Sequence, residues 1–523
     1  MSSRSRAVLA VALGVAALHA WRLGEWLVDD AGITFAYARN LALGAGLVSQ
    51  PGVPPLEGFS NPLWTLLLAP FFTLGLFDAV WTPKILSFAL VAAAMVVLVQ
   101  EVEHRGVAAV LAASAVALLA ADTSFVVWSM SGLENPLLAL LLVISASLSL
   151  KAGGEGGARY DRAAGVVAGL LALTRPDALV YAAAYPAAVC LAHRDRVADL
   201  VRRMVPYGLN VASVFGSYLI FRRAYFGDWV PNTYHAKVRP WMMSVDPDRL
   251  RELVESAVGR WMWPALAVMA LAATAALLGR ASRRVAILAV YLGLASFAYL
   301  ALPPDWMGEY RFATGFFIFF YWMLGEALAW LWDSAHRYRR WLAAATALLI
   351  AGESATVHAA RTKAFAGRPT VPFARIAEFA DGYDQLSAAL GPGRYSLLTP
   401  DLGGMLFRSR LRIYDLAGLC DATIARTLMD DGPAFRDYVF ETTRPTFIHI
   451  HGSWADWASL HADSRFARDY VVLHETWERP RGADASKGEP WAGDYVRRDA
   501  ASATTIERVR HELHRLGLDR PLP

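Results

Sequence analysis

Two adjacent carboxylates, Asp29 and Asp30, follow the first apolar run of the chain. That run, Ala7–Trp21, stands behind a basic start and is nearly long enough to cross a bilayer. The pair is therefore expected at or just beyond the far membrane face, where ionisable side chains are candidates for function. A carboxylate there could take a proton from a hydroxyl group as a general base, or bind a cation. The alternative is an acidic loop that is merely solvated.

The stretch after the acidic pair adds three polar candidates for binding a substrate. Arg39 lies on a predicted helix at 33–43, whose apolar residues indicate a helix at the membrane interface. Glu57 and Asn61 come after a long loop rich in Gly and Pro, which we expect to be ordered or to act as a gate. A further apolar run begins at Pro62.

Two later turns carry charges next to predicted membrane helices. Glu134 stands where an apolar run begins, so it is either a substrate ligand or an acid favoured by the dipole of that helix. Arg175 and Asp177 belong to a tight turn between two apolar runs. Their charges either face a substrate or pair with each other across the turn.

The segment Pro231–Lys237 contributes an amide, an imidazole and an ammonium group, on Asn232, His235 and Lys237. Lys237 suits a lipid phosphate as a point charge, or its long side chain simply extends to the membrane interface. His235 is expected to be a hydrogen-bond donor, because no second histidine stands at metal-ligand spacing.

The last candidate loop contains Asp305, Trp306 and Arg311. Arg311 begins an apolar span, and an arginine binds a phosphate through two parallel hydrogen bonds. It is therefore the best candidate for a clamp on the phosphate of a donor. The alternative is an ion pair between Arg311 and Asp305 or Glu309.

The composition places these loops on a multi-pass membrane protein. Of the 523 residues, 56% are hydrophobic. Apolar runs recur at about 7–21, 84–100, 107–121, 135–150, 163–174, 178–192, 206–221, 260–278, 285–302, 312–332 and 340–355. A run at 62–77 is interpreted as a juxtamembrane or re-entrant helix, because a crossing there would flip every later span and put the Arg-rich loops on the face opposite the basic N-terminus. The expected topology is about eleven spans with a cytoplasmic N-terminus and an outer C-terminus.

Charge, cysteine content and motifs exclude several classes of function. The net charge of +4 follows from arginines in short loops, so no nucleic acid is needed to explain it. The two cysteines, Cys190 and Cys420, are not expected to pair or to bind a metal. Phosphate-binding loops, dinucleotide fingerprints and zinc-protease motifs are absent from the sequence. An outer-face enzyme without nucleotides needs a donor that is already activated, and a polyprenyl-phosphate-linked sugar fits that need.

The chain divides into a membrane domain at 1–356 and a C-terminal domain at 357–523. Strand patterns at 395–398, 412–416, 446–451 and 470–475 mix with helical periodicity at 372–390 and 505–516. This mixture predicts a small α/β domain outside the membrane, with a polar loop at about 480–500.

Seven segments together resemble a group of GT-C-fold membrane glycosyltransferases, and are similar to the actinobacterial terminal β-(1→2)-arabinofuranosyltransferase family. They lie in the family's order and span most of the chain: Asp29–Asn40, Glu57–Trp64, Ser131–Glu134, Leu173–Asp177, Gly227–Lys237, Asp305–Phe312 and Tyr414–Asp421. Gly32 is a departure, because a bulkier residue is usual there, and it puts the fit of the acceptor in question.

The resemblance implies a polyprenyl-phosphate sugar donor and a site at the outer face of the cytoplasmic membrane, where the acceptor is a cell-envelope glycan. It implies that one of Asp29 and Asp30 is the general base of an inverting transfer, while the other positions the acceptor or a metal. No cofactor is required, and a divalent cation stays open because no complete set of oxygen ligands is evident. Arabinofuranose, mannose, glucose and another pentose are all candidate sugars.

The competing interpretations are non-catalytic. One is a protein that transports or handles lipid-linked saccharides on the same scaffold, and another is an envelope-assembly or motility-linked protein of the same fold. Transporters often show inverted repeats and helices broken at the midplane of the membrane. Here the polar residues gather at one membrane face instead, which favours the transferase.

Overall fold

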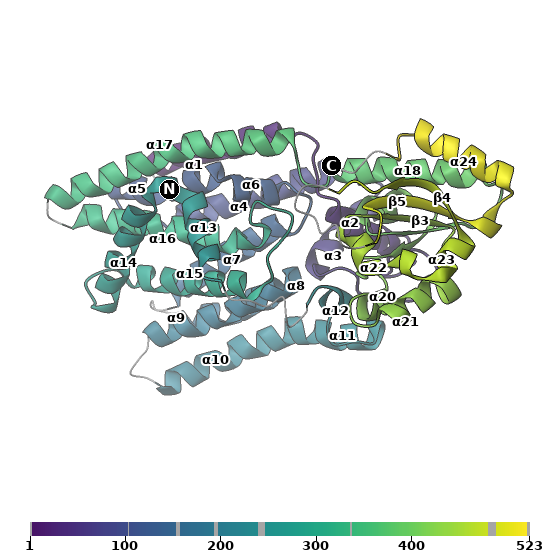
Figure 1. The fold of residues 1–523 in the computed structure, drawn as a ribbon. Coiled ribbons are helices and arrows are strands. Elements are labelled where there is room, and N and C mark those ends of the chain that lie inside the picture. The colour runs from purple at the N-terminus through teal and green to yellow at the C-terminus, as the bar shows by residue number, and fades with distance from the viewer. Residues whose placement is uncertain are drawn as a thin grey trace.

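The computed structural model describes residues 3–102, 104–152, 157–192, 197–238, 246–334, 337–479 and 488–519. Within these ranges the chain forms a large helical part and a smaller part built on a five-stranded sheet (Figure 1). Residues 193–196, which belong to a predicted cytoplasmic loop, and 480–487, which begin the predicted polar loop, lie outside the described residues.

The helical part is built around α16 (Thr314–Asp333). In the apolar window of this span, 94% of the residues are buried within the protein. Its aromatic and aliphatic side chains pack against α5, α14, α15 and α17. The other long helices of this part surround α16 and the four helices that pack against it (Figure 1). The helices of this part are α1 (Ser3–Arg22), α4 (Trp81–Gln100), α5 (Gly106–Ala121), α6 (Thr123–Ser129), α7 (Asn135–Lys151), α8 (Asp161–Thr174), α9 (Ala184–Ala192), α10 (Val197–Val211), α11 (Ser217–Phe226), α12 (Asn232–Lys237), α13 (Asp248–Val258), α14 (Met262–Leu277), α15 (Arg283–Ala301) and α17 (Arg337–Gly367).

Among the described residues, six helical segments are long and apolar enough to cross a membrane: 81–100, 198–226, 248–277, 283–301, 311–333 and 337–367. The pair α5–α6 makes a seventh if it counts as one span, although it bends by 61°. Asp122 explains the bend, because its side chain accepts the N–H of Phe125 and starts α6 afresh. The multi-pass architecture is confirmed, whereas the count of about eleven spans stays a prediction.

Two short helices lie between the two parts, and together with α19 (Gly403–Arg408) they form what we call the junction. α3 (Pro62–Thr73) has 12 residues, so its length of about 18 Å falls short of a bilayer core. α2 (Asp30–Ala42) packs between α3 and α19, and all residues from 31 to 38 are buried. The predicted helix at 33–43 therefore exists, but its first two turns are enclosed by protein instead of resting on lipid with one face, and exposure begins toward its C-terminal end.

The C-terminal part contains a mixed sheet in the order β2-β1-β3-β5-β4. β1 pairs in parallel with β2 and β3, while β5 pairs antiparallel with β3 and β4. Helices α18 and α24 cover one face, and α20–α23 cover the other (Figure 1). The elements are α18 (Phe373–Ala389), β1 (Ser396–Thr399), β2 (Arg412–Asp415), α20 (Ala422–Thr427), α21 (Gly432–Asp437), β3 (Phe447–His451), α22 (Ser453–Ala458), α23 (Ser464–Asp469), β4 (Tyr470–Thr476), β5 (Ala492–Arg497) and α24 (Ala503–Arg515).

The four predicted strands and both predicted helices of this part are confirmed within a few residues. The predicted loop at 480–500 is wrong for residues 492–497, which form the strand β5 between β3 and β4. α17 continues through the predicted domain boundary at 356 and ends at Gly367. Ile33 and Tyr37 of α2 belong to the same apolar core as α18 and the sheet, so the first outer segment is built into the C-terminal part.

Candidate active site

The two neighbouring carboxylates point to different partners. Both oxygens of Asp29 accept backbone N–H groups of α19, from Gly403 at 2.8 Å and from Gly404 at 2.7 Å. Asp29 is only 6% exposed, and burial raises the pKa of its carboxyl group to about 8, against the lowering effect of these two donors. Asp29 thus ties the start of α2 to the start of α19.

Glycine makes this close approach possible. A Cβ atom on Gly403 would lie 1.7 Å from the carbonyl oxygen of Asp29, and one on Gly32 would lie 2.4 Å from the carbonyl carbon of Gly403. The backbone would have to move to admit either methyl group. Gly32, the departure from the family pattern, therefore faces α19, and its small size serves packing at the junction.

Asp30 faces two cations. Its Oδ2 lies 3.0 Å from Nη1 of Arg311, and its side chain is 22% exposed. Burial acts to raise the pKa of Asp30, but the charges of Arg311 and Lys237 outweigh it and lower that pKa from the ordinary 3.8. At neutral pH Asp30 is a carboxylate, and it is the more accessible member of the pair.

The loop before Arg311 has an unusual backbone. Gly308, Glu309 and Tyr310 have φ angles of 73°, 45° and 50°, and the two residues with side chains cost about 1–3 kcal/mol each in such a conformation. The carbonyl of Glu309 accepts the indole N–H of Trp128 at 2.8 Å, and its carboxylate pairs with Arg361 at 2.6 Å. These contacts hold the strained loop in place.

Arg311 has a hydrogen-bond donor that no described residue uses. Its Nη1 also contacts the sulfur of Met307 at 3.1 Å, and its guanidinium group lies over the ring of Trp128. Its Nε is buried and has no hydrogen-bond partner among the described residues. The expected alternatives, pairing with Asp305 or Glu309, do not occur, because the carboxylate beside Arg311 is that of Asp30.

A buried polar network lies behind this pair. Glu134 accepts hydrogen bonds from Arg175 at 2.9 Å and from the side-chain amide of Asn61 at 2.8 Å. Arg175 also pairs with Asp177 at 3.0 Å, which is the mutual ion pair weighed from the sequence. The guanidinium group of Arg175 lies 4.8 Å from the ring centre of Phe312, the neighbour of Arg311 in the chain. The network supports the site with polar groups that already have partners.

Three of the predicted substrate ligands connect parts of the protein to each other. Glu57 is 1% exposed and pairs with Arg222 at 2.5 Å. The amide of Asn232 donates to the carbonyls of residues 418 and 419, and the guanidinium of Arg39 donates to those of residues 406 and 407. The contacts of Arg39 and Asn232 bind α2 and α12 to the C-terminal part, and the Glu57–Arg222 pair binds α11 to the loop before α3.

The remaining candidates lie toward the surface. His235 shares a hydrogen bond of 2.9 Å with Asp228, as expected for a hydrogen-bonding histidine. Lys237 is exposed, and its charge acts on Asp30. Asp305 accepts the N–H of Met307, leaving its buried Oδ2 without a partner among the described residues, and Trp306 is 71% exposed. The structure therefore pairs Asp30 with Arg311, places Lys237 where its charge acts on Asp30, and leaves Asp305 and Trp306 in the adjoining loop.

The sequence did not reveal the residues that hold Asp29 and the loop before Arg311 in place. Trp128 and the Glu309–Arg361 pair support the strained loop, and Gly403 and Gly404 bind Asp29. The consecutive glycines of α19 were the one available signal. As a whole, the junction offers one accessible carboxylate beside two cations. Such a group of side chains can bind an anion and deprotonate a hydroxyl group next to it.

No protein-family model and no curated protein matches the sequence. Solved structures do match the fold. ArnT from Cupriavidus metallidurans bound to undecaprenyl phosphate aligns over 95% of this chain and 98% of its own, with a TM-score of 0.59 and 14% identity. The oligosaccharyltransferase AglB from Archaeoglobus fulgidus, in complex with an inhibitory peptide and a dolichol-phosphate, aligns over 92% and 74%, with a TM-score of 0.53 and 12% identity. These neighbours confirm the predicted GT-C fold.

Proposed function

We propose that this chain is a glycosyltransferase that moves a sugar from a polyprenyl-phosphate donor to a cell-envelope glycan at the outer face of the cytoplasmic membrane. The observation that carries the proposal is the Asp30–Arg311 pair, which joins an accessible carboxylate to a guanidinium group whose buried Nε has no partner among the described residues. The fold supports it, because both structural neighbours were solved with a polyprenyl-type phosphate bound.

Arg311 is the proposed clamp for the donor phosphate. A phosphate offers several strong acceptor oxygens, so it can occupy both Nε and Nη of the guanidinium group, which Asp30 alone does not. Lys237 adds a point charge from the exposed end of α12. Arrival of the phosphate draws Arg311 away from Asp30 and leaves that carboxylate available to the acceptor.

Asp30 is the proposed general base. It takes the proton of the acceptor hydroxyl as that oxygen bonds to the anomeric carbon of the donor sugar. The bond from that carbon to the phosphate oxygen breaks on the opposite side, and the polyprenyl phosphate leaves with the electron pair, so the anomeric configuration inverts. Before the donor binds, the charges of Arg311 and Lys237 lower the pKa of Asp30, so the base is already ionised when donor and acceptor arrive.

Asp29 is a positioning residue in this proposal. Its two oxygens bind α19, and this contact sets the first turn of α2, which carries Asp30. The transferred sugar stays open between arabinofuranose, which the family resemblance suggests, and a mannose, a glucose or another pentose. A divalent cation near the acidic pair also stays open.

The test is an in vitro transfer assay. Purified full-length protein in lipid nanodiscs receives a panel of polyprenyl-phosphate sugars together with glycan acceptors extracted from membranes. Wild type is expected to release polyprenyl phosphate and to label the glycan with one donor of the panel. The matched control is Asp228→Asn, because Asp228 is an outer-loop carboxylate that pairs with His235 and Arg426, away from Asp30.

Two results would argue against the proposal. Transfer by Asp30→Asn at the wild-type rate would exclude Asp30 as the base. Binding of lipid-linked sugars without transfer to any acceptor would favour the alternative, a protein that transports or handles lipid-linked saccharides.

A further inference from the structure

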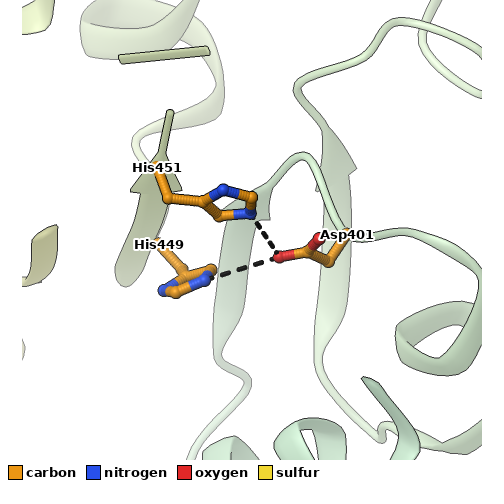
Figure 2. A group of neighbouring side chains, drawn as sticks. All are labelled: Asp401, His449 and His451. Atoms are coloured by element: carbon orange, nitrogen blue, oxygen red, sulfur yellow. Dashed lines mark hydrogen bonds and ion pairs between the residues drawn. The ribbon is translucent and has the colours of Figure 1, made fainter. Parts of the chain in front are cut away.

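A second cluster of titratable side chains lies in the C-terminal part, at one edge of the sheet (Figure 2). Asp401 follows β1, and His449 and His451 lie on the parallel neighbour β3. Residues two apart on a strand point to the same face, and parallel strands bring their carboxyl ends to the same edge. Three side chains from two separate segments of the sequence thereby converge.

The three ligand atoms have the spacing of a metal site. Oδ2 of Asp401 lies 2.9 Å from Nε2 of His451 and 3.5 Å from Nε2 of His449. With zinc–ligand bonds of about 2.0–2.1 Å at the tetrahedral angle, neighbouring ligand atoms lie roughly 3.3 Å apart. The two observed distances bracket that value.

His449 supplies an independent observation. This side chain is 5% exposed, and its Nδ1 lies 2.7 Å from a carboxylate oxygen of Asp494, which also accepts the hydroxyl of Tyr383. Its Nε2 is directed at Asp401 (Figure 2), yet it is buried without a hydrogen-bond partner among the described residues. Buried nitrogens are nearly always satisfied, and a histidine held by a carboxylate on its far side is the usual arrangement around a metal.

We propose that Asp401, His449 and His451 bind one divalent transition-metal ion, of which zinc best suits two imidazoles and a carboxylate. Three protein ligands leave one position of a tetrahedral ion for water. The ion crosslinks β1 to β3 and fixes the turn that leads into α19, where Gly403 and Gly404 bind Asp29. It therefore acts on the junction through structure, and its binding does not depend on the sugar transfer.

A second histidine cluster serves as the internal comparison. His474, His514 and Asp519 also lie within ligand distance of one another. The side chains of His514 and Asp519 are 46% and 28% exposed, and among the described residues this cluster has no buried, unpartnered nitrogen like Nε2 of His449. We assign the metal to the first cluster.

The test uses the full-length protein in detergent, stripped with a chelator and then titrated with zinc chloride. His451→Gln removes a ligand at the rim, where the side chain is 30% exposed, and His474→Gln is the matched control. We expect one bound zinc per chain by mass spectrometry of the metal in wild type and in the control. In His451→Gln we expect affinity to fall by more than the roughly 10–100-fold that loss of an outer-shell partner costs.

Cobalt substitution adds a measurement that would stay unchanged if His451 had only a structural role. Wild type loaded with Co²⁺ should show the intense visible absorption of a tetrahedral site, and His451→Gln should lose it while keeping its size-exclusion profile. Wild-type zinc affinity in His451→Gln, loss of zinc in His474→Gln, or no stoichiometric zinc in wild type would overturn the proposal. None of these readouts uses a sugar donor, so they leave the proposed transfer reaction to its own test.

Discussion

Two of the protein's arginine–carboxylate pairs, Arg203–Asp161 and Arg311–Asp30, differ in how completely their hydrogen-bonding groups are satisfied. At one end, every guanidinium nitrogen of Arg203 binds protein, through Asp161, Tyr185 and the carbonyl of Ala152. At the junction, Arg311 keeps a buried Nε without a described partner, and the carboxylate of Asp30 is 22% exposed, against 2% for Asp161. The saturated pair can only hold helices together, whereas the open pair can exchange one partner for a ligand.

Substituting the two carboxylates gives the largest expected contrast. Asp30→Asn should lower the rate of sugar transfer by about 10²–10⁴-fold, because the general base is lost, and should lower the melting temperature less than Asp161→Asn does, because the Asp30 carboxylate is 22% exposed and accepts a single hydrogen bond from Arg311. Asp161→Asn should instead cost roughly 3–5 kcal/mol of stability, because it leaves Arg203 buried without its counter-charge. Transfer assays and thermal melts of both variants measure the contrast. The comparison is contradicted if Asp30→Asn has a lower melting temperature than Asp161→Asn and if Asp161→Asn has a lower transfer rate per folded molecule than wild type.

Substituting Arg311 should change both the use of the donor and the pH dependence of transfer. Arg311→Gln removes the proposed phosphate clamp and should reduce kcat/KM for the donor by about 10²–10³-fold. Because Arg311 is the strongest of the charges that lower the pKa of Asp30, the variant should also move the acid limb of the pH–rate profile to higher pH. Profiles of wild type and variant measured over the acid range check the direction. An unchanged acid limb would contradict the coupling between Arg311 and Asp30.

Docking of α19 on α2 should be sensitive to a single methyl group. In Gly403→Ala the new Cβ would meet the carbonyl oxygen of Asp29, so the backbone must shift at a cost of about 1–3 kcal/mol. A lower melting temperature and a partial loss of transfer are expected. Gly352→Ala is the matched control, because a Cβ there meets nothing within 4 Å. Equal melting temperatures for the two variants would show that the contact at Asp29 is not tight.

The smallest effect is expected at Lys237, an exposed cation. Lys237→Gln should raise the KM for the donor by only a few-fold, because an exposed ion contact contributes about 0.2–1 kcal/mol. The difference from wild type should shrink as salt is added, since the charge is screened. Donor titrations at low and high salt measure it, with Arg223→Gln as a nearby exposed cation for control. A lower kcat in Lys237→Gln would place this side chain closer to the reacting atoms than proposed.

Much of the fold could be predicted, because membrane helices and buried strands leave strong local patterns. The strands at 396–399 and 447–451 and the short helix at 62–73 follow from apolar content and turn residues alone. The strand at 492–497 was missed because its Gly and Asp suggested a loop, whereas pairing with two neighbours stabilises it.

The site was predictable in its residue types but not in its partners. The adjacency of Asp29 and Asp30 is visible in the sequence, yet their separate roles depend on Gly403 and Arg311, both more than 270 positions away. Glu57 and Asn232 look like substrate ligands until Arg222 and the turn at 418–419 are placed beside them. The metal-type cluster was invisible, because Asp401 meets His449 only when β1 and β3 pair.

Donor binding by Asp30→Asn is the most direct test of the central claim, that Asp30 performs the chemistry while Arg311 holds the phosphate. A radiolabelled polyprenyl-phosphate sugar, of the kind that wild type uses, would be titrated against both proteins in nanodiscs. We expect Asp30→Asn to bind the donor at least as tightly as wild type, because Arg311 is released from its carboxylate, and to transfer it about 10²–10⁴-fold more slowly. Loss of donor binding in Asp30→Asn, or transfer at the wild-type rate, would contradict the account.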